Sequence, residues 1–207
     1  MRLPMFPLGS VLVPSAGLPL HVFEPRYRAL VADCLAGDRE FGVVLIERGS
    51  EVGGNDVRTS VGTVARIVEA VELPDGRWTV VAVGVRRIRV LDWIPDDPYP
   101  AAEVEDWPDP DPGVGHAEAV QGVLVRLRRC LALAAEAGDR TAPATIELSE
   151  DPVLAVHQAS IVAPLGPLDQ HRLLAATTPD ERAERLTSLL DDAIEVLELR
   201  LGTSGAG

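Results

Sequence analysis

The feature that most constrains the fold is a pair of apolar segments near the N-terminus, both interrupted by prolines. They are residues 3–8 (LPMFPL) and residues 18–27 (LPLHVFEPRY). Proline has no N–H, and it is tolerated at the starts and edges of strands but not in the centre of a sheet. We therefore expect a first extended segment over residues 3–13 and a second over residues 18–23, with a turn at residues 15–17 between them.

The second segment runs directly into a helix. Pro25 stands at the expected first turn, where the missing N–H has no helical partner to lose. The apolar positions that follow have the spacing of an amphipathic helix, and Gly37 is the expected end of that helix. These apolar positions are Tyr27, Leu30, Val31, Cys34 and Leu35.

The rest of the first half is rich in strand patterns. Residues 49–60 are polar and glycine-rich, which is typical of a long functional loop between two strands. Gly84 interrupts another strand pattern, as a residue in a β-bulge would. Strands are expected at residues 41–46, 61–73, 77–83, 85–94 and 101–107. Short strands at this spacing favour a closed or partly closed barrel.

The second half is predicted to be helical. It follows an acidic, proline-rich stretch at residues 108–115, and its helices are expected at residues 116–137, 151–163, 167–176 and from a Thr178 cap onward. The fold class is therefore α+β. Its parts are a β-barrel subdomain with one helix (1–107), a linker (108–115), an α-helical subdomain (116–201) and a disordered tail (202–207).

The basic residues exclude several kinds of chemistry. All 19 are arginine, so the chain has no lysine for a P-loop, a Schiff base or a Ser–Lys dyad. The sequence contains no H-E-x-x-H, C-x-x-C or G-x-S-x-G pattern. We therefore expect no catalytic residue, no metal and no cofactor, and we expect that the chain is not an enzyme.

Charge and apolar pattern limit the partners and the compartment. A net charge of −13 disfavours phosphate backbones and anionic membranes. No apolar run reaches the ~20 residues of a membrane span, and the early prolines break the helical region that a signal peptide needs. Two cysteines, Cys34 and Cys130, are too few for a disulfide scaffold, so a cytoplasmic protein with reduced thiols is expected.

Several separated motifs together resemble one family. Besides residues 3–8 and 18–27, they are VGTVARI (61–67), GVRRIR (84–89), EVE (103–105), QHRLL (170–174) and the Arg-Leu pair at 185–186. In this order they are similar to the N-terminal substrate-binding domain of Lon proteases. The resemblance implies a PUA-like β-barrel subdomain followed by an α-helical bundle. It also implies a bacterial, proteolysis-related module that binds unfolded or tagged proteins. The ATPase and peptidase parts of Lon have no room in 207 residues, so a stand-alone, non-catalytic Lon-domain protein is expected.

A peptide-binding site is predicted around the first two motifs. Its apolar residues could line a groove for an extended peptide that adds as a strand to the barrel edge, with the 49–60 loop as a cover. Its two polar residues could form the rim. Alternatively, the apolar residues belong to the core. The candidates are Phe6, Leu8, Phe23, Glu24, Arg26 and Tyr27. The partners would be polypeptide substrates or a dedicated protein, with an adaptor or regulator role in protein quality control; whether the chain forms a homo-oligomer is left open.

Binding of RNA is the alternative function. PUA-like barrels elsewhere bind RNA, and Arg86, Arg87 and Arg89 form the densest basic cluster of the β-rich half. The net charge and the few aromatic residues argue against nucleic acid, because RNA readers stack bases on rings. The other interpretation of this cluster is ion pairing with the many acidic side chains.

Overall fold

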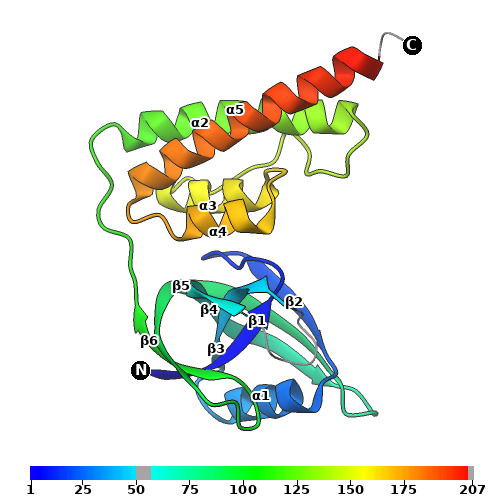
Figure 1. Ribbon diagram of the computed structural model, residues 1–207, viewed down its shortest axis with the longest axis vertical. Coiled ribbons are helices and arrows are strands. Elements are labelled where there is room, and N and C mark those ends of the chain that lie inside the picture. The colour runs from blue at the N-terminus through cyan, green and yellow to red at the C-terminus, as the bar shows by residue number, and fades with distance from the viewer. Residues whose placement is uncertain (50–56, 205–207) are drawn as a thin grey trace. The chain divides into compact units, whose positions relative to one another are not determined.

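The computed structural model describes residues 1–49 and 57–204, and it divides into two compact units. Unit 1 comprises Met1–Pro108 and carries the strands, and unit 2 comprises Asp109–Gly207 and carries helices (Figure 1). The fold class is α+β, as predicted from the sequence.

Unit 1 follows the order expected from the sequence, with differences at the ends of its elements. Its elements are β1 (Arg2–Leu8), β2 (Gly17–Val22), α1 (Pro25–Ala36), β3 (Glu40–Arg48), β4 (Val57–Glu72), β5 (Trp78–Ile94) and β6 (Ala101–Asp106). The first strand ends at Leu8 and not at residue 13. Strand β4 begins at Val57, so residues 57–60, which were predicted to be the end of the 49–60 loop, belong to a strand. Residues 50–56 lie outside the described part of the chain.

Five of the strands close into a ring. The sheet order is β2-β5-β4-β3-β1-β6, and β6 pairs with both β1 and β5. Besides β4, the long strand β5 pairs with two more strands, with β2 over residues 78–83 and with β6 over residues 88–94. Closure leaves few free edges in the ring, because β1 pairs with β6 over residues 2–4 and with β3 over residues 5–8. Strand β2 lies outside the ring and, in the described residues, pairs with β5 alone.

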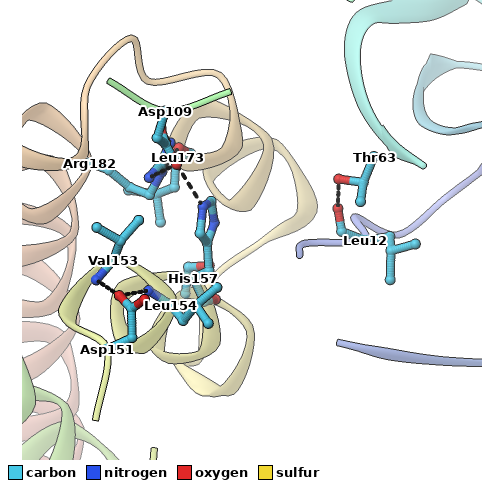
Figure 2. A network of polar contacts seen from close by, with 10 residues as sticks. Leu12, Thr63, Asp109, Asp151, Val153, Leu154, His157, Leu173 and Arg182 are labelled. Carbon is cyan, nitrogen blue, oxygen red and sulfur yellow. Dashed lines mark hydrogen bonds and ion pairs between the residues drawn. The ribbon is translucent and has the colours of Figure 1, made fainter. Parts of the chain in front are cut away.

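The segment between β1 and β2 is fixed to the barrel by backbone contacts. Leu12 and Val13 are buried, and the Thr63 hydroxyl donates a 2.6 Å hydrogen bond to the Leu12 carbonyl (Figure 2). Gly84 of β5 donates its N–H to the Ala16 carbonyl at 2.9 Å, and a Cβ on Gly84 would lie 2.2 Å from the Val13 carbonyl oxygen. The register of β5 shifts directly beside this glycine. Gly84 is therefore needed for the close approach of this segment.

Unit 2 is a packed set of helices around an aliphatic core. The helices are α2 (His116–Glu136), α3 (Pro152–Val162), α4 (Pro167–Leu174) and α5 (Pro179–Ser204). The Thr178 side chain accepts a hydrogen bond from the Glu181 N–H at 3.1 Å, which is the cap expected from the sequence. Helix α5 includes residues 202–204, where the sequence predicts the start of a disordered tail. Residues 205–207 lie outside the described part of the chain.

We expect the substitution Gly84→Ala to destabilise unit 1 by about 1–3 kcal/mol or more, because the added Cβ would overlap backbone atoms that cannot move away freely. The matched control is Gly17→Ala in β2, where no atom lies within 4 Å of the added Cβ. The control should change the free energy of unfolding by less than about 0.5 kcal/mol. Urea unfolding of the two variants checks this, and equal losses would contradict the close approach at Gly84.

Both thiols are buried, and each has a raised pKa. Burial, with a smaller contribution from the Asp33 charge, raises the pKa of Cys34 to about 12, and burial also raises the pKa of Cys130. Because the thiolate is the reactive form, Cys34 should have a roughly thousandfold lower thiolate population at pH 8 than a free cysteine. We therefore expect native protein to react with Ellman's reagent far more slowly than urea-unfolded protein. Rapid labelling of the native protein would contradict this burial.

Candidate functional site

A pocket of about 180 Å³ lies between β1 and β2, at the start of α1. Residues of three elements contribute to it. Phe6 and Leu8 come from β1, Leu20 comes from β2, and Tyr27 comes from the first turn of α1. The full lining is Phe6, Leu8, Pro19, Leu20, His21, Val22, Phe23, Glu24 and Tyr27.

The pocket exists where β1 and β2 do not pair with each other. Residues 5–8 of β1 pair with β3 on one side, and β2 pairs with β5 on one side. Each strand contains a proline, Pro7 next to the end of β1 and Pro19 in the middle of β2. A proline in a paired strand must keep its nitrogen on the side away from the partner strand. The edges that face the pocket therefore lack an N–H donor at these two positions.

Side chains of the predicted site differ strongly in burial. Phe6, Leu8 and Tyr27 are 8 %, 6 % and 4 % exposed, and the rings of Phe6 and Tyr27 stack with their centroids 4.1 Å apart. These three form the inner wall of the pocket and also belong to the core of unit 1. Phe23 is 57 % exposed although it is a large apolar residue. It is therefore the large apolar side chain of this pocket that is most exposed to a partner.

The two polar candidates neutralise each other. The Nε of Arg26 donates to the Glu24 carboxylate at 3.1 Å, and the Arg26 guanidinium lies 4.5 Å from the centre of the Tyr27 ring. Glu24 is the N-cap residue of α1, but its side chain makes no capping hydrogen bond. Arg26 is not part of the pocket lining itself. The pair gives the pocket a polar margin with little net charge.

Four lining residues were not singled out from the sequence: Pro19, Leu20, His21 and Val22. They belong to β2, in which Leu20 and Val22 are less exposed than Pro19 and His21. This alternation was visible in the sequence. The missing information was the position of β2 opposite β1, because that position depends on pairing with β5, about sixty residues later in the chain.

The predicted RNA cluster is engaged in contacts within unit 1. Arg86 pairs with Glu40 at 2.8 Å and with Asp106 at 2.9 Å. Arg87 is 3 % exposed, and the guanidinium groups of Arg87 and Arg89 lie 4.2 Å and 3.8 Å from the centre of the Trp107 ring. This arrangement does not favour a free basic surface for phosphates.

The described residues offer neither a metal site nor a membrane-spanning helix. No group of three or more histidine, cysteine, aspartate or glutamate side chains there has an arrangement that could hold a metal ion. In the same residues, no helix combines the length and the apolar character needed to cross a membrane.

Comparisons with known proteins agree on one family. The family model described as the ATP-dependent protease La (LON) substrate-binding domain matches residues 2–192. A Lon protease 2 from Herpetosiphon aurantiacus is 30 % identical over 203 residues, which cover 96 % of this chain and 25 % of that protein. A Lon protease 2 from Myxococcus xanthus is 37 % identical over 106 residues, covering 50 % of this chain and 13 % of that protein. The chain thus spans about a quarter of the length of the first of these relatives.

Solved structures show the same fold. The crystal structure of a Lon N-terminal domain protein from Xanthomonas campestris is 30 % identical, with a TM-score of 0.63, and the match covers 91 % of this chain and 98 % of that one. The N-terminal domain of a Lon protease from the Mycobacterium avium complex is 18 % identical with a TM-score of 0.65, over 93 % of this chain and 99 % of that one.

The different burial of the aromatic residues predicts different effects on stability. We expect Tyr27→Ala to destabilise unit 1 by about 3–5 kcal/mol, because it removes a buried ring from the core. Phe23→Ala, the matched control, should cost less than about 1 kcal/mol because that ring is largely in water. Urea unfolding measures both. Equal losses would mean that Phe23 is a core residue and not an accessible wall of the pocket.

Proposed function

This chain belongs to the LON substrate-binding domain family, and we propose that it binds unfolded polypeptide through the pocket between β1 and β2. The observation that carries the proposal is an apolar pocket with one accessible aromatic side chain, Phe23, beside strand edges that have no partner strand. Such a module would hold polypeptides without cutting them, as an adaptor or regulator in protein quality control does.

The pocket suits a side chain better than a free small molecule. Sites for drug-sized ligands usually measure about 300–1,000 Å³, and this one is smaller at about 180 Å³. Its inner wall is aromatic and aliphatic, so the guest should be an aliphatic or aromatic side chain. Phe23 lies at the β2–α1 junction, where it can pack against that side chain on binding.

The backbone of the guest can lie along the open strand edges. A peptide that adds to a sheet edge gains main-chain hydrogen bonds, and pockets for alternate side chains provide specificity. Here Pro7 and Pro19 remove donors from the two edges, so fewer main-chain bonds are available than at an ordinary edge. We therefore assign most of the affinity to the side chain in the pocket, and the recognition tolerates many sequences.

The pairing of Glu24 with Arg26 predicts how the binding affinity depends on salt. Because the margin of the pocket carries little net charge and the inner wall is apolar, binding should depend only weakly on ionic strength. Binding to a phosphate backbone would instead fall steeply with salt.

We expect Phe23→Ala to weaken binding of a labelled, permanently unfolded polypeptide about tenfold, the size of effect typical of a buried aromatic anchor. The matched control is Leu91→Ala on β5, which removes a similarly exposed apolar side chain (62 % against 57 %) that does not line the pocket. The control should leave the affinity unchanged. Fluorescence anisotropy at low and at high salt measures the dissociation constants.

Three outcomes would reject the proposal in distinguishable ways. Equal effects of the two substitutions would move binding away from the pocket. Salt-sensitive binding of single-stranded RNA, in the absence of polypeptide binding, would favour the alternative function. Lack of binding to either probe would exclude general recognition of unfolded chains.

A further inference from the structure

Asp109, the first residue of unit 2, is held by a buried network. Arg182 donates two hydrogen bonds to its carboxylate, from Nη2 to Oδ1 at 2.8 Å and from Nη1 to Oδ2 at 3.1 Å (Figure 2). The His157 Nε2 lies 3.4 Å from Oδ2. The side chain of Arg182 is completely buried, and its Nε donates to the Leu173 carbonyl at 3.0 Å. Asp109 is therefore fixed to α3 and α5, the helices that carry its partners.

Between Asp109 and Gly113, the chain makes no polar contact that fixes it within the described residues. Asp111 is exposed, and its side chain has no polar contact within the described residues. The next fixed position is Gly113, whose N–H donates to the Asp180 carboxylate at 2.8 Å. That same carboxylate also contacts His116 Nδ1 at 2.8 Å. Residues 109–112 thus form a strap that is fastened by Asp109 at one end and continues to Gly113 at the other.

The chain just before the strap is held in unit 1. The Trp107 N–H donates to the Arg87 carbonyl at 2.9 Å. Its ring has the guanidinium groups of Arg87 and Arg89 near its face, at 4.2 Å and 3.8 Å from the ring centre. With Trp107 held in one unit and Asp109 in the other, Pro108 is the single residue between two fixed positions. A proline has a fixed φ, which reduces the freedom of this connection further.

We infer that Asp109 is a latch that sets the length of the connection between the two units. When the latch is closed, the connection is one residue, Pro108. When Asp109 leaves Arg182, the connection becomes residues 108–112, with Gly113 as the next fixed position. Four additional residues add about 13–14 Å of reach. Residues 109–112, which have the composition of a linker, therefore lengthen the connection between the units only when Asp109 is released from Arg182.

The two partners of the latch differ in burial. The Asp109 side chain is 17 % exposed, whereas Arg182 is completely buried. Opening returns the carboxylate to water, where it is well solvated, and Arg182 keeps its hydrogen bond to the Leu173 carbonyl. Opening also leaves the buried Arg182 guanidinium without its carboxylate, which is unfavourable, so the latch is closed in most wild-type molecules and opens when the pair is removed by substitution.

The test is a ¹⁵N relaxation measurement on the full chain. In the wild type, the amides of Asp109 and Asp111 should have order parameters of about 0.85, the value of rigid backbone. In Asp109→Asn they should fall below about 0.6. Asp111→Asn is the matched control, because it neutralises an identical side chain two residues away that has no such contacts, and it should leave both values high.

A second variant keeps the test valid if Asp109→Asn does not fold, since that change leaves Arg182 buried without its carboxylate. The double variant Asp109→Asn/Arg182→Met replaces the buried charge with an apolar side chain, and dispersed amide signals from α5 would show that unit 2 is folded. A mobile strap in the folded double variant supports the latch. A rigid strap in that variant, or equal loosening by Asp111→Asn, would overturn it.

Discussion

The gap between β1 and β2 depends on two nitrogen atoms that cannot donate hydrogen bonds. Pro7 lies next to the end of β1 and Pro19 lies in the middle of β2, and each strand is paired on one side only at that point. A strand edge interrupted in this way is a poor partner for another edge, which is how natural sheets avoid unwanted pairing. The ring closes instead through β6, and the space that remains next to β2 becomes the pocket. The prolines that limit the fold in the sequence thus also define where a guest could bind.

The local patterns in the sequence were sufficient for the elements, but not for the accessibility of the site. Pro25 and the apolar stripe after it predicted α1 correctly, because helix starts and periodicity are local properties. Phe6, Phe23 and Tyr27 looked equivalent in the sequence, since each is an aromatic residue within the same motifs. In the structure Phe6 and Tyr27 stack inside the core, whereas Phe23 is 57 % exposed. That difference follows from the direction of the chain between β2 and α1, which depends on tertiary packing and cannot be derived from residue type.

The sequence also could not show which residue of the strap is fixed. Asp109 and Asp111 occupy identical settings in the sequence, each between two prolines, and composition alone assigns both to a solvated linker. Only Asp109 has a buried arginine within reach, and that arginine comes 73 residues later in the chain. A buried ion pair is weak evidence for stability, because apolar residues of similar size often stabilise a core as well or better. The Arg182–Asp109 pair instead determines which of two aspartates with equivalent sequence neighbours is the fixed position.

The charges of the chain complement the apolar pocket. Many arginines contact carboxylates of the same unit, such as Arg86 with Glu40 and Arg126 with Asp191, while the net charge remains −13. Unit 1, which holds the pocket, also has more acidic than basic residues, while the margin of the pocket is neutralised by the Glu24–Arg26 pair. Long-range charge mainly changes the rate of association, and short-range apolar contact mainly changes the rate of dissociation. For the proposed function, this separation lets the surface repel nucleic acids and other polyanions, while the residence time of a bound polypeptide is set by the apolar pocket.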